Sequence, residues 1–162
     1  MGRASLNDYL RIEDPPVARY ASKPLTRGYK DVAVLMIGYD DCDIAGSQKN
    51  RSLLMNELRD GYHYTVQNES FTTCSQNDLE TKIDTIIHKF AADHGQVKSN
   101  LLLLSLMGRG GVWENRSLHL TPTHKRTMSI DISELLRRLP LKVNCSVLAL
   151  PDCCWAGHIA AQ

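Results

Sequence analysis

Near the carboxyl end of the sequence, a cysteine lies in a setting that suits nucleophilic catalysis. Cys154 follows an apolar segment and comes two residues after Asp152, and the small residues Ala156 and Gly157 follow it. A thiolate at the end of a buried strand, in a tight turn that glycine permits, is well presented for attack on a carbonyl carbon. The pattern therefore predicts that Cys154 is a nucleophile.

Cysteine catalysis also needs a group that transfers protons, and a second glycine-rich segment follows another predicted strand. Residues 108–111 read Gly-Arg-Gly-Gly and directly follow the apolar run of residues 101–107. Working residues of parallel sheets lie beyond the carboxyl ends of the strands, so we expect Arg109 and Cys154 at one edge of a sheet. By its position, Gly110 is a candidate donor of a backbone N–H to an oxyanion.

Four segments have the composition of sheet strands. Residues 31–37, 101–107 and 145–150 are nearly continuous apolar runs, which is typical of parallel strands buried on both faces. Residues 62–66 are rich in aromatic and branched side chains and form the predicted second strand. Residues 112–120 are predicted to form a small hairpin.

Helices are predicted between these strands. Residues 48–59 form the first, and a capping box that begins at Ser75 starts the second, which carries apolar residues at helical spacing. The third ends at Leu139, with Asp131 or Ser133 as its cap.

The alternation of strands and helices predicts an α/β fold with a mostly parallel sheet flanked by helices. We expect the domain to cover residues 31–162. Residues 1–30 contain three prolines and little periodicity, so they are predicted to form an N-terminal arm or linker.

Composition excludes several classes of protein. The net charge of +1 gives no field that would attract nucleic acid or an anionic membrane surface. No apolar run approaches the roughly 18 residues that cross a bilayer, and the N-terminus lacks the apolar stretch of a secretory signal, so we expect a cytoplasmic protein. The five cysteines form no Cys-x-x-Cys pair, which gives no indication of a zinc site or another cofactor.

The two motifs resemble those of the caspase/metacaspase-like cysteine peptidases. Residues 152–157, Asp-Cys-Cys-Trp-Ala-Gly, resemble the metacaspase nucleophile motif Asp-Ser-Cys-His-Ser-Gly, and they fit the Gln-Ala-Cys form of caspases less well. Residues 108–111 resemble the Gly-His-Gly that ends the third strand and supplies the catalytic histidine. The resemblance covers about 125 residues and implies the large-subunit part of a three-layer caspase-like fold.

The resemblance also implies roles for single residues. Cys154 matches the nucleophile, and Arg109 takes the place of the histidine. Asp152 matches an acidic wall of a pocket that receives a basic side chain in metacaspases. One of Asp40, Asp41 or Asp43 is the second acid of that pocket, and we select Asp41. Some metacaspases use calcium through acidic loops, so a calcium requirement is left open.

Arginine at position 109 changes the expected chemistry. A guanidinium stays protonated and has no acceptor, so it can stabilise a thiolate but cannot carry protons. Removal of general acid–base help costs roughly 10²–10⁴-fold in rate. Three other histidines, which we expect at the surface, are candidate substitutes: His119, His124 and His158.

The sequence leaves three functions open. The first is an impaired, caspase-like pseudo-peptidase that acts as a regulator or scaffold, in cell-death or immune signalling as family members do. The second is an active cysteine endopeptidase that cleaves after basic residues. The third is another parallel α/β domain, flavodoxin-like or hydrolase-like, although no Gly-x-Gly-x-x-Gly, Walker or Gly-x-Ser-x-Gly motif is present.

Partners follow from the same resemblance. A protein or peptide is the expected substrate or partner. The family's sheet has two more strands after the nucleophile, which this sequence does not contain. An open strand edge invites pairing, so a homodimer or association with a small-subunit segment is expected.

Overall fold

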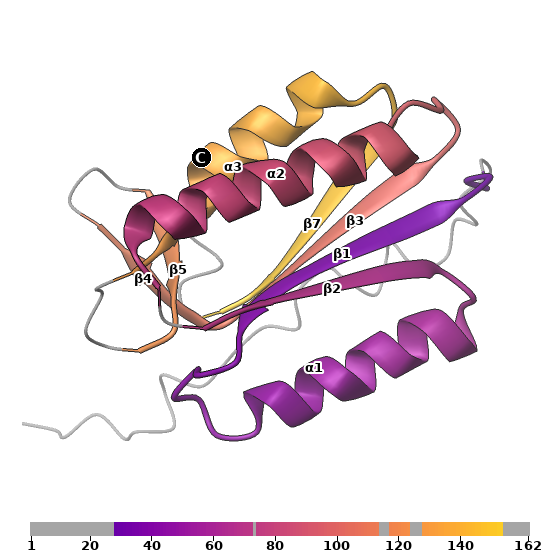
Figure 1. The fold of residues 1–162 in the computed structure, drawn as a ribbon. Coiled ribbons are helices and arrows are strands. Elements are labelled where there is room, and N and C mark those ends of the chain that lie inside the picture. Colours follow the sequence, from indigo (N-terminus) through magenta and orange to yellow (C-terminus); the bar gives the residue numbers. More distant parts are fainter. Residues whose placement is uncertain (1–27, 73, 114–116, 124–127, 154–162) are drawn as a thin grey trace, which may run out of the picture.

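A four-stranded parallel sheet forms the centre of the molecule (Figure 1). The computed structural model describes residues 28–72, 74–113, 117–123 and 128–153. The sheet has the strand order β2-β1-β3-β7. Its strands are β1 (Val32–Tyr39), β2 (Thr65–Phe71), β3 (Leu101–Met107) and β7 (Ser146–Asp152). The prediction of an α/β fold with a mostly parallel sheet is confirmed.

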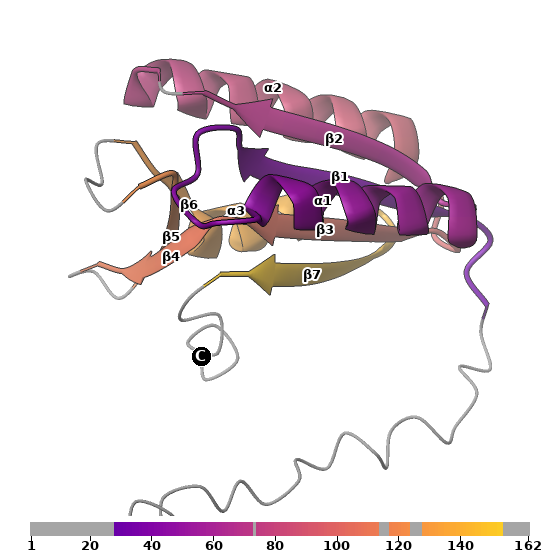
Figure 2. The ribbon, with the colours of Figure 1, turned by 90° about the horizontal axis from the view of Figure 1, so that it is seen from below.

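Helices cover both faces of this sheet, which gives three layers (Figures 1 and 2). Helix α1 (Ser47–Asn56), continued by a π-helical turn η3 (Glu57–Gly61), packs on one face. Helices α2 (Gln76–His94) and α3 (Ile132–Arg138), the latter followed by a 3-10 turn η4 (Leu139–Lys142), pack on the other. Within the described ranges, no helix combines the length and the apolar character that a membrane span requires.

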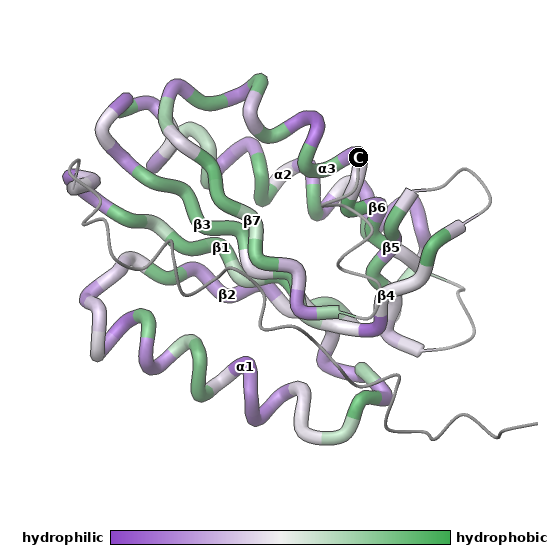
Figure 3. The backbone as a smooth tube through the Cα atoms, turned by 180° about the vertical axis from the view of Figure 1, so that it is seen from behind, coloured by the Kyte–Doolittle hydropathy of each residue, from purple (hydrophilic) through white to green (hydrophobic). Residues whose placement is uncertain are grey.

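The two central strands carry the core. Residues 33–39 of β1 and 102–107 of β3 are buried on both sides of the sheet, as their continuous apolar sequences predict. Figure 3 shows these strands as hydrophobic along most of their length. The larger core lies under α2 and α3, and the smaller core, around Val34, Met36 and Leu103, lies under α1.

A second, antiparallel sheet follows β3 at the carboxyl edge of the parallel one. It consists of β4 (Arg109–Val112), β5 (Leu118–Thr121) and β6 (Ile130–Asp131). The predicted hairpin over residues 112–120 is therefore present, but its first strand begins earlier, at Arg109. The hydroxyl of Tyr39, at the end of β1, donates to the carbonyl oxygen of Leu120 at 3.1 Å and joins the two sheets.

Side-chain caps begin two helices at the predicted positions. The Ser75 hydroxyl accepts a hydrogen bond from the backbone N–H of Asp78 at the start of α2. At α3 the cap is Asp131 rather than Ser133, because the Asp131 carboxylate accepts from the backbone N–H of Glu134. Both helices begin at the carboxyl edge of the sheet.

Two predictions for strands need correction. The second strand lies at residues 65–71 and not at 62–66, because His63 has a positive φ of 58°, which breaks extended backbone before the strand begins. Strand β7 is not buried on both faces: Leu148 and Leu150 are 48% and 45% exposed. It lies at the end of the described sheet, and the core under α1 contains no residue of β7.

The predicted N-terminal arm, residues 1–30, lies almost wholly outside the described residues. Its last residue, Lys30, donates a backbone hydrogen bond to Ser99 at 2.9 Å. This contact places the start of the domain at the edge of the sheet opposite the predicted catalytic residues.

Candidate active site at the carboxyl edge of the sheet

The strands that precede the two predicted motifs are adjacent. In the pairing of β3 with β7, Met107 is the register partner of Asp152. The backbone N–H of Gly108 also points to the carbonyl oxygen of Asp152, at a long distance of 3.4 Å. The end of β3, which leads into Arg109, is therefore beside the residue that begins the cysteine motif.

Arg109 is held by an acid from a third segment. Its Nε donates to Asp43 Oδ1 at 2.8 Å, and the two side chains are 25% and 31% exposed. The loop that carries Asp43 is fixed in turn, because the backbone N–H of Asp43 donates to the carbonyl oxygen of Pro122 at 3.0 Å. The charge of the guanidinium is thus largely balanced by a carboxylate at the same edge.

The three aspartates in the loop after β1 make different contacts. Asp40 accepts from Arg51 at 3.4 Å and from the hydroxyl of Ser70, so it braces α1 against the sheet. Asp41 is exposed and lies close enough to Tyr39 to help raise the pKa of its phenol. Asp43 is the acid that contacts Arg109, a contact separate from the substrate-pocket role predicted for Asp41.

The predicted nucleophile, Cys154, lies outside the described residues. Its neighbour Cys153 is described, half-buried and not in a disulfide. Gly110, the candidate oxyanion donor, is half-buried in β4 and paired in register with Leu120. Its role therefore stays a prediction, as do those of Asp152 and Asp41.

His119 is not a surface residue, contrary to expectation. It is 6% exposed, in the middle of β5, and its register partners are Gly111 on β4 and Asp131 on β6. Nδ1 lies 3.1 Å from the hydroxyl of Ser129, and Nε2 lies 2.6 Å from that of Ser117. His124 and His158 lie outside the described residues.

The register places His119 near Arg109. Arg109 is paired with Thr121, and His119 is two residues before Thr121. Alternate residues of a strand share a face, so Arg109 and His119 lie diagonally on one face of the β4–β5 ladder, typically about 7–8 Å apart. Contacts to two hydroxyl groups nevertheless hold the imidazole of His119 in place.

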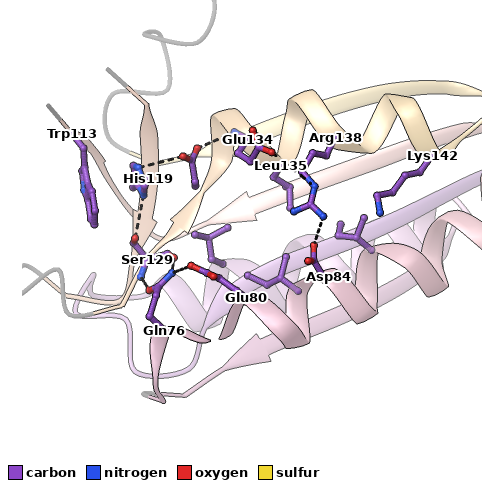
Figure 4. Close-up of a pocket in the computed structure, with 14 residues that line it drawn as sticks. Gln76, Glu80, Asp84, Trp113, His119, Ser129, Glu134, Leu135, Arg138 and Lys142 are labelled. Atoms are coloured by element: carbon purple, nitrogen blue, oxygen red, sulfur yellow. Dashed lines mark hydrogen bonds and ion pairs between the residues drawn. The ribbon is translucent and has the colours of Figure 1, made fainter. Parts of the chain in front are cut away.

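An aromatic ring covers this histidine. The Trp113 indole stacks on His119 with ring centroids 4.0 Å apart and an interplanar angle of 11°. The pair forms one end of a cleft between α2 and α3 (Figure 4). The sequence does not reveal this cluster, because a tryptophan just after one strand and a histidine on the next carry no distinctive spacing.

The remaining cysteines and possible metal ligands show no catalytic arrangement among the described residues. The four described cysteines, Cys42, Cys74, Cys145 and Cys153, are not in disulfides. Burial raises the pKa of the Cys145 thiol, which makes it less reactive than an ordinary cysteine. Within the described part of the chain, no three His, Cys, Asp or Glu side chains gather as a metal site.

No protein-family model matches the sequence, and no curated protein matches it at a significant level. The arrangement of the site therefore has to be interpreted from its own chemistry. What it brings together is a guanidinium, a carboxylate that balances it, and the start of a cysteine-containing segment.

Proposed function

We propose that this chain is a caspase/metacaspase-like pseudo-peptidase, which binds a protein or peptide without cleaving it efficiently. The observation that carries the proposal is the position of Arg109. It begins β4, two residues after β3 ends at Met107 and where the resemblance places a catalytic histidine, and Asp43 holds its guanidinium in an ion pair. A regulatory or scaffolding role, as in cell-death or immune signalling, fits such a site.

The arrangement of the chain supports the proposal. Strands β3 and β7 are direct neighbours, and their carboxyl ends carry the two segments that resemble the family's motifs. Parallel α/β sheets place functional residues at this edge. An architecture of this kind hosts many functions, so the proposal depends on the residues at positions 109 and 152–154 and not on the fold.

The chemistry of arginine explains why cleavage should fail. A guanidinium remains protonated and offers only N–H donors, so it cannot take a proton from a thiol or return one to a leaving amine. The ion pair with Asp43 also limits the positive charge that remains to stabilise a thiolate. Both effects point to a weak nucleophile and to no general acid.

Acidic side chains at the same edge suit a basic partner. Asp152, Asp41 and Asp43 all lie at or just beyond the carboxyl ends of their strands, and the side chains of Asp152 and Asp41 are exposed. A peptide with an arginine or lysine would find complementary charge here. We therefore infer that the partner segment is basic.

The experiment compares cleavage and labelling in the same protein. Wild type and Cys154→Ala are incubated with fluorogenic peptides that carry Arg, Lys or Asp before the cut, with and without calcium. The proposal predicts no turnover above that of Cys154→Ala for any peptide. Mass spectrometry after iodoacetamide treatment then ranks the cysteines, and Cys145, whose pKa burial raises, serves as the slow internal reference.

The alternative, an active cysteine endopeptidase, makes the opposite prediction. If the wild type cleaves after basic residues and Cys154→Ala abolishes the activity, the chain is an active cysteine endopeptidase. His119 is then the first base to test by substitution with Asn, because it lies on the same face of the β4–β5 ladder as Arg109.

A further inference from the structure

A cleft of about 590 Å³ lies between α2, α3 and the antiparallel sheet; of the residues discussed above for catalysis, it contains only His119 (Figure 4). Its floor is apolar, formed by Ile83 and Ile87 of α2, Ile130 of β6 and Leu135 of α3. These four residues are at most 7% exposed, so the floor is part of the packed core. Small-molecule sites have about this volume, typically roughly 300–1,000 Å³, and the same apolar lining with a few polar groups.

One end of the cleft is an aromatic wall. The stacked rings of Trp113 and His119 stand there, and the hydroxyl of Ser129 holds the imidazole. The indole N–H is buried, and no acceptor among the described residues is within hydrogen-bond distance of it. A flat indole beside an apolar floor favours a ligand with an apolar body, and its π-face attracts a cation.

The charges around the cleft are unequal along its length. At the aromatic end, Glu80 contacts only a neutral partner, the amide of Gln76 at 2.8 Å, and it forms no ion pair with any described residue. Asp131 caps α3 and lies 3.6 Å from Nε2 of His119. Among the described residues, the aromatic end of the cleft is therefore acidic.

Toward the other end, acids and bases are paired. Arg138 reaches across the cleft from α3 to Asp84 on α2, with Nη2 and Oδ1 2.9 Å apart. Glu134 is bonded to Arg137 on its own helix. Lys142 lies beside His88, beyond these pairs. Among the described residues, each carboxylate of this half has a cation, so the attraction for a positive charge is concentrated near Trp113 and Glu80.

We propose that this cleft binds a small organic cation: an aromatic or branched apolar body that lies on the isoleucine and leucine floor, with a protonated amine between Trp113 and Glu80. The apolar body gains from removal of its surface from water. The amine gains from the carboxylate of Glu80 and from the indole face. This inference goes beyond the proposed function and does not depend on it, because the binding needs neither Cys154 nor Arg109.

A matched series of three probes tests the proposal: 3-phenylpropylamine, 3-phenylpropan-1-ol and 3-phenylpropanoate. They share the same body and differ in charge. Each is titrated into ¹⁵N-labelled protein, and the indole N–H of Trp113 is followed together with the backbone amides of Ile83 and Leu135. Trp155→Phe leaves a single tryptophan and assigns the indole signal.

The expected result is binding in the order amine, alcohol, carboxylate. The amine should bind about threefold to tenfold more tightly than the alcohol, as expected for one partly exposed charge pair. In Glu80→Gln this preference should fall to about twofold or less, while alcohol binding stays the same. Asp93→Asn removes a charge from an exposed position of α2 outside the cleft and should keep the preference.

Three results would overturn the proposal. These are equal affinities for amine and alcohol in the wild type, a preference that survives Glu80→Gln, and chemical shifts that change only outside the cleft. Because Glu80 is exposed, its substitution should leave the fold intact. The unchanged dispersion of the amide spectrum verifies this. Absence of peptidase activity has no bearing on any of these readouts.

Discussion

Arg109 and Asp43 form an ion pair of 2.8 Å that joins the segment after β3 to the loop after β1. The two residues are far apart in the sequence and come together because parallel strands β1 and β3 are neighbours that end at the same edge. On the proposed function, the pair lies where a peptidase of this type has its proton-transferring side chain. If the proposal holds, a fixed positive charge and a fixed negative charge take the place of a group that can exchange protons.

The first prediction concerns the effect of this pair on Cys154. In Asp43→Asn, Arg109 loses its balancing charge and a nearby negative charge disappears, so a thiolate in the vicinity becomes more favourable. Alkylation of Cys154 by iodoacetamide at pH 7 should become about threefold to tenfold faster. Stopped aliquots analysed by mass spectrometry give the rate.

Asp93→Asn, on the outer surface of α2, is the control for this experiment. It should leave the alkylation rate of Cys154 unchanged. Equal rates in wild type and in Asp43→Asn would mean that the ion pair has no influence on the thiol, and the proposed site would lose its electrostatic basis.

The second prediction concerns Tyr39, which joins the two sheets. Burial raises the pKa of its phenol above the ordinary value of 10.0, and nearby Cys74, Asp41 and Cys42 add to the effect. The native state thus holds this proton more tightly than the unfolded chain does. The stability that results is complete below pH 10 and is lost as the pH rises above it, by at most about 1.4 kcal/mol per pH unit.

Tyr39→Phe should show two changes. At pH 8 the free energy of unfolding should fall by about 0.5–1.5 kcal/mol, because the hydrogen bond to Leu120 is lost. Between pH 10 and 11 the further loss of stability should be smaller than in the wild type, since the phenol no longer titrates. Urea unfolding across this range measures both, and an unchanged alkaline slope would refute the assignment.

The third prediction concerns Gly38, where the first strand approaches a buried arginine. A Cβ at this position would lie 2.6 Å from Nη1 of Arg51 and 3.1 Å from the carbonyl oxygen of Met107. Arg51 is only 9% exposed and pairs with Asp40, so it has little room to move. Gly38→Ala should lower the free energy of unfolding by about 1–3 kcal/mol.

Gly28→Ala is the matched control, because among the described residues no atom beyond its chain neighbours lies within 4 Å of the position of its added Cβ. The same substitution there should be neutral or slightly stabilising, through the reduced entropy of the unfolded chain. Equal effects at both glycines in urea unfolding would show that the contact with Arg51 does not constrain Gly38.

Much of the fold was predictable where one physical effect dominates. Strands β1 and β3 are buried on both faces, so their sequences are almost purely apolar and their limits could be predicted closely. The start of α2 depends on a local hydrogen bond between Ser75 and Asp78, which the sequence pattern reveals. Features of this kind depend on residues that are near one another in the chain.

The rest depends on partners that are distant in sequence. Strand β2 is at an edge and mixes polar residues such as Gln67 and Glu69 with apolar ones, so its pattern was weak. The pairing of Asp43 with Arg109 depends on where Arg109 lies in space, which position along the loop does not reveal. His119 is buried because Ser117, Ser129 and Trp113 surround it, an environment that no spacing along the chain predicts.

The central claim is that position 109 disables a cysteine-peptidase site, and Arg109→His tests it most directly. The measurement is kcat/KM for a fluorogenic peptide with arginine before the cut, for wild type, Arg109→His and Arg109→His combined with Cys154→Ala. The account predicts a gain of about 10²-fold or more over wild type in Arg109→His, and its loss when Cys154 is removed. Wild type that cleaves as well as Arg109→His, with activity dependent on Cys154, would contradict it.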